Sequence, residues 1–198
     1  MLAGYTCGIS MFQTRCLLPV FLTAIAAATV SSGATFLQLS MDQMGQLATS
    51  IVRARVISSS ASLNASPGSP TIYTHYKLSV SEVWKGVAAA EVMMPGGDFN
   101  GQKQSFPGVP ELRVGGEYVL FLWKSPSTGI VHTIGLTQGI FEVNSRADGS
   151  VLASRRQSGE LMLDGSGQRV SDQPVSMKLV DMKTRVLQVR ASATGTAK

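Results

Sequence analysis

The sequence predicts a mainly β fold, a barrel or sandwich of antiparallel strands with one short helix before the strands and another after them. Two observations support this prediction. Short apolar or alternating segments recur along the chain, separated by turn residues about every 8 to 12 positions. No regular alternation of strand and helix is present, although a parallel, nucleotide-binding sheet would require it.

The first 34 residues have the three-part layout of a secretory signal peptide. Arg15 precedes an apolar run, 17–30, that is shorter than the roughly 20 residues needed to cross a bilayer. The small residues Ser32 and Ala34 lead us to expect cleavage after Ala34. We therefore expect an exported protein, periplasmic or extracellular, with no integral membrane span after cleavage. An uncleaved anchor is the alternative.

Composition narrows the class of protein further. The 198-residue chain has a formal net charge of +5 and two cysteines, Cys7 and Cys16, both in the expected leader. The mature chain should then have no disulfide, thiolate metal site or cysteine nucleophile. We expect one domain, 35–190, with its own core, and a disordered tail, 191–198. The basic residues are dispersed along the chain, which argues against a nucleic-acid partner.

The domain is expected to open with a helix and a strand. Ser40 and Gln43 form a capping box, which predicts a helix over 41–49. The next segment, "IVRARVIS", alternates apolar side chains with arginines and predicts a half-buried strand. Residues 58–70, "SSSASLNASPGSP", are rich in serine, glycine and proline, and we expect an exposed loop there.

Residues 71–86, "TIYTHYKLSVSEVWKG", predict the longest strand, which Gly86 should end. A strand of about 11 or 12 residues exceeds the usual length, and such strands commonly coil through both halves of a barrel. Tyr73, His75 and Lys77 project together from one side of it. They are our candidates for a ligand-binding surface, and a solvated strand face is the alternative.

Residues 94–101, "MPGGDFNG", place a glycine pair beside an acid. The segment lacks the second acid of a diguanylate cyclase signature, and no helix follows that could bind a phosphate. We therefore predict a structural turn, in which Pro95 stops a third strand, "EVMMPGG", and Gly96 and Gly97 permit positive φ. "GQKQSF" is expected to pair back on that third strand.

The rest of the chain predicts further strands and a closing helix. "PGVPELRVGGE" reads as a crossing segment, and "EYVLFLWK" is apolar enough for a central strand. Val175, Leu179, Met182 and Val186 have helical spacing, with Ser176 as the expected N-cap. Shorter strands are expected at "IVHTIG", "GIFEV", "VLAS" and "ELML".

We predict no catalytic residue, no metal site and no cofactor. His75 and His132 are the only histidines, whereas a zinc site generally has three or four protein ligands. No serine stands in a G-x-S-x-G elbow. "NSRADG", 144–149, predicts a turn rather than a calcium loop, because Arg146 stands where that loop needs an oxygen ligand.

Five segments, taken in order, resemble a group of uncharacterised exported bacterial proteins. The shared features are a strand reaching Lys-Gly, a Pro-Gly-Gly turn, a Gly-Glu before an apolar strand, and a Gln-Gly-x-Phe. The resemblance covers about residues 41–143. The segments are "IVRARV", "YTHYKLSVSEVWKG", "VMMPGGDFNGQ", "FPGVPELRVGGEYVLFL" and "IGLTQGIFEV".

The layout is also similar to netrin-like domains and tissue metalloproteinase inhibitors, which have an OB-type five-stranded barrel. The resemblance implies an OB-like antiparallel barrel of about five to seven strands, with a short N-terminal helix and a C-terminal helix. It does not imply protease inhibition by the same mechanism, because those inhibitors bind the catalytic zinc through an N-terminal cysteine and the mature chain has none.

We therefore expect an exported, non-catalytic β-barrel domain that binds an unidentified protein or another component of the cell envelope. Two alternatives stay open. One is a secreted hydrolase without a recognisable motif. The other is a peptidase inhibitor acting through the proline-rich segment "FPGVPEL", 106–112.

Overall fold

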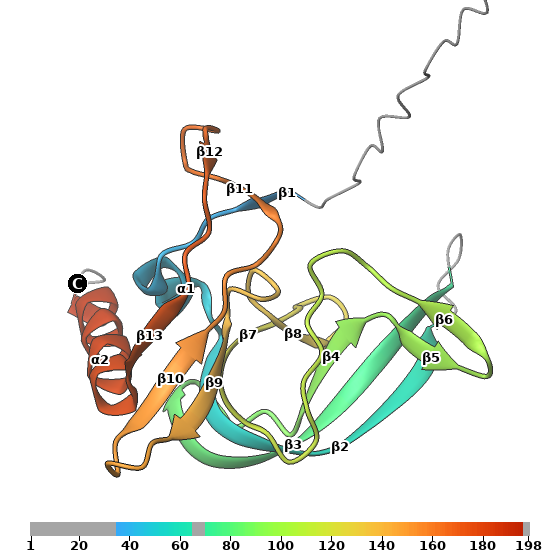
Figure 1. The fold of residues 1–198 in the computed structure, drawn as a ribbon, viewed down its shortest axis with the longest axis horizontal. Coiled ribbons are helices and arrows are strands. Elements are labelled where there is room, and N and C mark those ends of the chain that lie inside the picture. The colour runs from blue at the N-terminus through green and yellow to red at the C-terminus, as the bar shows by residue number, and fades with distance from the viewer. Residues whose placement is uncertain (1–34, 65–69, 196–198) are drawn as a thin grey trace, which may run out of the picture. The chain divides into compact units, whose positions relative to one another are not determined.

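The computed structural model describes residues 35–64 and 70–195, which form a mainly β fold with two helices (Figure 1). The expected signal peptide lies outside these residues, as do 65–69 and 196–198. The described strand pairs are antiparallel except for β1 with β11. The predicted mainly β chain with a helix near each end is confirmed.

The elements of the described residues follow one another as a run of strands between the two helices. In chain order they are β1 (Thr35–Leu37), α1 (Met41–Leu47), β2 (Ser50–Asn64), β3 (Thr71–Lys85), β4 (Glu91–Pro95), β5 (Gly97–Phe99), β6 (Gln102–Gln104), β7 (Glu117–Lys124), β8 (Val131–Thr133), β9 (Ile140–Ser145), β10 (Val151–Arg155), β11 (Leu161–Leu163), β12 (Arg169–Val170), β13 (Val175–Lys178) and α2 (Leu179–Gly195).

The main sheet of the described residues has eight strands, ordered β13-β10-β9-β7-β2-β3-β4, with β8 added to β7. β2 and β3 are 15 residues each and curve strongly (Figure 1). Register shifts along their pairing, one of them between Val56 and Ser58, mark the bulges that increase local twist and bend the strands. The central position predicted for "EYVLFLWK" is confirmed by β7, which pairs with β2, β8 and β9.

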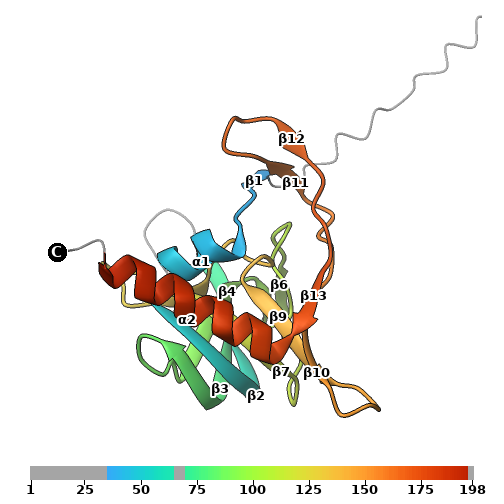
Figure 2. The same cartoon turned by 90° about the vertical axis from the view of Figure 1, so that its left-hand side faces the viewer.

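Two hydrophobic clusters lie on opposite faces of this sheet. We call the face enclosed by the curled strands the inner face and the opposite one the outer face. α1 and α2 lie along the outer face (Figure 2) and cover part of it. The inner cluster includes Val52, Ala54, Tyr76, Val92 and Leu120. The outer cluster, under the helices, includes Met44, Ile51, Trp84, Phe121, Phe141, Met182 and Val186.

The start and end of α1 follow from a few side chains. Ser40 Oγ accepts a hydrogen bond from the Gln43 backbone N–H, and Gln43 Oε1 accepts one from the Ser40 N–H, so the predicted capping box is confirmed. At the other end, the Lys85 ammonium donates to the carbonyl oxygens of Gly45 and Gln46 at 2.8 and 2.9 Å. A cation is favoured there because these helix-end carbonyls carry partial negative charge.

The prediction of a loop over 58–70 is wrong for its first half. Residues 58–64 continue β2 and pair with β3 as far as Asn64 with Thr71. Serines and an asparagine are accommodated because β3 satisfies the backbone, while much of this stretch is exposed and needs no apolar side chains. The remaining residues, 65–69, lie outside the described ranges.

The segment after Pro95 also differs from the prediction. β6 pairs with β5 rather than with β4, and the chain reverses at Asn100 and Gly101, whose φ values are 51° and 76°. Two successive residues at positive φ are typical of the tight turn that matches strand twist. Gly96 and Gly97, at φ 101° and 133°, instead redirect the chain between β4 and β5.

Two predictions near the C-terminus are corrected. Ser176 is not an N-cap, because it lies in β13 and pairs with Ser154 of β10. The predicted disordered tail begins at Ala191, but α2 continues to Gly195. The Ser192 hydroxyl donates to the Gln188 carbonyl, and adding residues to an existing helix costs far less than starting one.

Candidate functional site

Tyr73, His75 and Lys77 alternate along β3 with residues of the inner cluster such as Tyr76, and so lie on the outer face. The helices α1 and α2 lie over the other end of the sheet (Figure 1). Their partners on β4 are Pro95, Met93 and Glu91, respectively. Directly paired residues share a face of a sheet, so these side chains form one continuous surface. We call this surface, with Ser62 of β2 and His132 of β8, the uncovered outer face.

His75 connects a hydroxyl to a carboxylate across three strands. Ser62 Oγ lies 2.7 Å from its Nε2, and Glu91 Oε1 lies 2.8 Å from its Nδ1. When Glu91 accepts the proton of Nδ1–H, Nε2 is left as an acceptor for the Ser62 hydroxyl. A serine, a histidine and an acid in this order can activate a serine nucleophile. We call these three residues the serine-histidine-glutamate row.

An aromatic pair lies beside this row. The ring centroids of Tyr73 and His132 are 6.4 Å apart and the rings are tilted by 47°. His132 Nδ1 is also 3.2 Å from the carbonyl oxygen of Met93, which links β8 to the edge strand β4. The Lys77 side chain is exposed and forms no hydrogen bond or ion pair within the described residues. The surface thus offers aromatic, basic and hydroxyl groups together.

The helix-covered end of the same two strands is organised differently. Glu82 accepts from Arg53, from Lys183 of α2 and from the indole N–H of the buried Trp84. Arg53 also bonds Glu117 at 2.7 Å. Chiefly through the hydrogen bond from Lys183, the pKa of Glu82 is lowered to about 2. These polar groups are therefore used by the fold itself.

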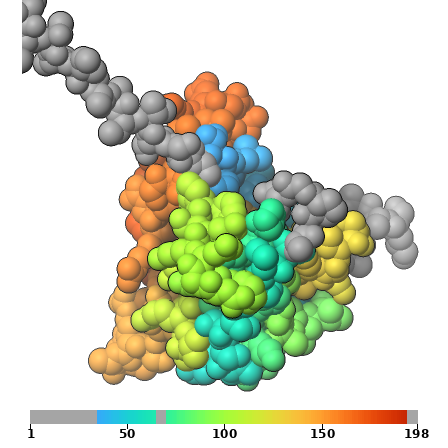
Figure 3. All heavy atoms as spheres, turned by 90° about the vertical axis from the view of Figure 1, so that its right-hand side faces the viewer, coloured from blue at the N-terminus to red at the C-terminus, as the bar shows by residue number. Residues whose placement is uncertain are grey.

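A pocket of about 450 Å³ lies at the edge of the uncovered outer face. It is bounded by the segment that leads into β4 and by the turn between β7 and β8, which lie side by side in Figure 3 (green and yellow). Glu91 and Met93 belong to both the pocket and the uncovered outer face. The apolar lining is formed by Val87, Ala88, Ala89, Ala90, Met93, Ile130 and Val131.

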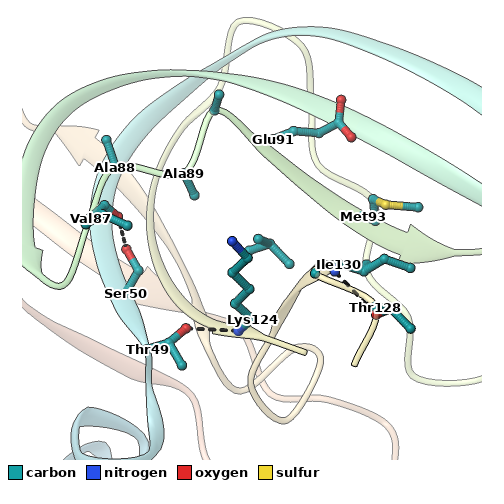
Figure 4. A pocket seen from close by; sticks show the side chains of 13 residues that line it. Thr49, Ser50, Val87, Ala88, Ala89, Glu91, Met93, Lys124, Thr128 and Ile130 are labelled. Carbon is teal, nitrogen blue, oxygen red and sulfur yellow. Dashed lines mark hydrogen bonds between the residues drawn. The ribbon is translucent and has the colours of Figure 1, made fainter. Parts of the chain in front are cut away.

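Lys124, the last residue of β7, extends its side chain into this pocket (Figure 4). Its backbone N–H donates to Thr49 Oγ1 at 2.9 Å, which fixes the start of the side chain. Its ammonium group has no hydrogen-bond or ion-pair partner in the part of the chain that the structure describes. The ammonium is consequently free to bind a ligand.

Several residues that carry the sequence resemblance have structural roles. Gln138 is 2% exposed, and its side-chain amide bonds the Leu39 N–H and the Leu37 carbonyl, which attaches the N-terminal segment to the domain. At Gly86, a Cβ would lie 2.0 Å from the Thr49 carbonyl oxygen. At Gly97 it would lie 2.5 Å from Thr74 Oγ1. These motifs describe how the chain folds rather than what it binds.

The proline-rich segment 106–112, the candidate inhibitory loop, is exposed at Phe106 and Pro107 and is anchored at Gly108 to Pro110 and at Leu112. Leu112 is buried in the inner cluster. Gly108, at φ 77°, packs against Phe36, whose ring would lie 2.7 Å from an added Cβ. Val109 and Pro110 are half-buried.

Reasoning from sequence missed Ser62, Glu91, His132 and Lys124. Ser62 could have been found from strand periodicity continuing through 58–64, but the serine content of this stretch favoured a loop. The sequence around Lys124 does not indicate a site, because the pocket is formed by two distant segments, the one before β4 and the β7–β8 turn.

No group of three or more histidine, cysteine, aspartate or glutamate side chains that could hold a metal ion is present in residues 35–64 and 70–195. Neither described helix is both long enough and apolar enough to span a membrane. No protein-family model matches the chain, and no curated protein is significantly similar to it.

Proposed function

We propose that the chain is an exported, non-catalytic β-barrel domain that binds a protein or another component of the cell envelope through the uncovered outer face. One observation carries this proposal. Tyr73, His75 and Lys77 share a face with His132 and Glu91. Both helices lie over the other end of the sheet (Figure 1). At the other end of β3, the corresponding polar groups lie beneath α2 and bond to one another.

The OB-like barrel is part of the proposal, and the strand order supports it. An OB-type barrel has five strands and is partly open. β4, β3, β2, β7 and β8 are successive neighbours by pairing. β4 and β8 then approach each other at Met93 and His132, where one side chain bridges the gap. The expected signal peptide supports export.

The pockets favour binding over catalysis. Neither Ser62 nor His75 lines any of five pockets found in the described residues. An enzyme that attacks an acyl group also needs preorganised donors for the oxyanion, usually in a concave site that excludes water. In our proposal the serine-histidine-glutamate row therefore holds the His75 ring in one orientation for a partner.

The test is capture of partners from the native envelope with the tagged mature protein. A variant that combines Tyr73→Ala, His75→Ala and Lys77→Ala should fold normally and lose the partners. The matched control combines Val180→Ala and Leu187→Ala, two exposed apolar residues of α2 that are 64% and 41% exposed, and it should keep them. Equal capture by both variants would refute the proposed surface.

The serine-histidine-glutamate row favours a second candidate function, a secreted hydrolase. In such a reaction the Ser62 oxygen would bond to the acyl carbon of an ester, and His75 would accept the hydroxyl proton and pass it to the departing alcohol. Glu91 would keep the His75 ring in the required tautomer. Water would then release the acyl group and regenerate Ser62.

A fluorophosphonate probe separates the two candidates. A hydrolase would be phosphonylated at Ser62, and labelling would be lost in Ser62→Ala but kept in Ser60→Ala, the exposed neighbour on the same face of β2. The binding proposal predicts no labelling of any serine, which mass spectrometry of the treated protein measures directly.

A further inference from the structure

We propose that the pocket around Lys124 binds a small carboxylic acid with a short apolar chain. This inference rests on the proposed binding function and assigns a ligand class to the pocket beside the uncovered outer face. The pocket volume of about 450 Å³ lies within the range of roughly 300–1,000 Å³ typical of small-molecule sites.

The Lys124 ammonium would hold the carboxylate. It reaches into the pocket (Figure 4) and has no partner in the described residues. Thr128, elsewhere on the lining, accepts from the Ile130 N–H through its Oγ1, and its hydroxyl proton has no acceptor in the described residues. The other hydroxyls of the lining are engaged, Ser50 with the Val87 carbonyl and Thr49 with the Leu122 carbonyl.

The apolar lining of the pocket suits the alkyl part of the ligand. Three consecutive alanines, Ala88 to Ala90, leave space that larger side chains would fill, and Met93 and Ile130 contribute apolar surface across from them (Figure 4). Burying an alkyl chain against such walls is favourable at about 0.8 kcal/mol per CH₂ group. A purely polar anion would gain nothing from this lining.

The charge balance favours a monoanion over a dianion. Lys124 is the only cationic residue of the lining and Glu91 is the only anionic one. Glu91 repels both anions, but a doubly charged phosphate is repelled more strongly and is neutralised only in part by one ammonium group, whereas a carboxylate matches Lys124 in charge.

The experiment is calorimetric titration of the mature protein with hexanoate, and separately with hexylammonium and hexyl phosphate. We expect saturable binding of hexanoate, weaker binding of hexyl phosphate and none of hexylammonium. Lys124→Met keeps the apolar stem and should weaken hexanoate binding about tenfold or more. Lys103→Met, at an exposed lysine of β6 outside the pocket, should leave it unchanged. Ala89→Phe should block binding while Lys124 is retained.

Three results would overturn the inference: no saturable hexanoate binding, hexylammonium binding as tightly as hexanoate, or an unchanged affinity in Lys124→Met. Capture of envelope partners separates this inference from the proposed function. If partner capture depends on Tyr73, His75 and Lys77 but hexanoate does not bind, the pocket assignment alone is refuted. If the triple-alanine variant captures the same partners as the wild type, the proposed binding surface is refuted, whether or not the pocket binds hexanoate.

Discussion

The two ends of the β2–β3 pair carry similar polar side chains on the same face but use them differently. At the helix-covered end, Glu82 accepts from Arg53, from Lys183 of α2 and from the indole N–H of Trp84. At the other end, Tyr73 and His75 remain uncovered. The comparison shows that polarity on a strand does not by itself separate side chains that bond to the fold from side chains left open to a partner, and that the element above them has to be considered as well.

The difference has an energetic meaning. Partly buried charges must be paired, so removing one partner at the covered end leaves another charge without compensation. At the other end, Glu91 is 39% exposed and can replace a lost protein contact by water at small cost, whereas Glu82 is 29% exposed and accepts from three donors. Stability should therefore be concentrated at the covered end and binding at the uncovered end.

The largest predicted difference is between two aromatic residues of β3. Trp84 is 1% exposed in the outer cluster, and Trp84→Ala should lower the free energy of unfolding by about 3–5 kcal/mol. Tyr73→Ala should cost about 1 kcal/mol or less, because the half-buried ring packs on an open face. Urea denaturation measures both. Similar losses would contradict the assignment of stability to the covered end.

Two glycines provide the next test. Gly86→Ala should destabilise the domain by about 3 kcal/mol or more, because φ is 69° and the added Cβ would lie 2.0 Å from the Thr49 carbonyl oxygen. Gly101 has a similar φ, 76°, but nothing lies within 4 Å of an added Cβ. Gly101→Ala should therefore show only the conformational penalty, about 1 kcal/mol. Thermal unfolding compares the two, and an equal shift would contradict the packing at Gly86.

Acid should weaken the covered end through Glu82. Its pKa is lowered to about 2 in the folded protein, chiefly by the bond from Lys183. The stabilisation is then complete above the ordinary pKa near 4.5 and is lost as the pH falls from there toward 2. After solvent screening we expect about 1–2 kcal/mol over this interval.

Glu82→Gln should flatten the dependence of unfolding free energy on pH between about 4.5 and 2. Glu111→Gln, at an exposed carboxylate without an ion pair in the described residues, is the control and should keep the wild-type slope. Identical slopes in wild type and Glu82→Gln would show that the Lys183 contact does not contribute.

The smallest effect on stability is expected at His75. His75→Ala should change the free energy of unfolding by less than about 1 kcal/mol, because Ser62 and the half-exposed Glu91 regain water. The same variant should still impair partner capture. Chemical denaturation and capture from the envelope are the two measurements, and strong destabilisation with intact capture would identify the serine-histidine-glutamate row as a structural feature.

Features set by neighbouring residues were predictable from the sequence. The Ser40–Gln43 capping box depends on residues three apart, and the alternation around Arg53 and Arg55 follows from strand geometry alone. The long strand and its end at Gly86 were likewise readable, because both depend on local conformation.

Features set by pairing between distant segments were not predictable. The bonds from His75 to Ser62 and Glu91 require three strands in register, and that register passes through bulges. Ser176 has the chemistry of an N-cap, yet pairing with β10 places it in a strand. In both cases, long-range contacts determine a role that local chemistry leaves open.

Site-specific photo-crosslinking in the intact envelope tests the central claim most directly. A benzoylphenylalanine would replace Tyr73 on the uncovered outer face or Val180 on the exposed side of α2, and covalent adducts would be identified by mass spectrometry. The structure leads us to expect a defined adduct from position 73 and none from position 180. Adducts from position 180 alone, or the same adducts from both positions, would contradict the claim that ligands are bound at the uncovered end of β3.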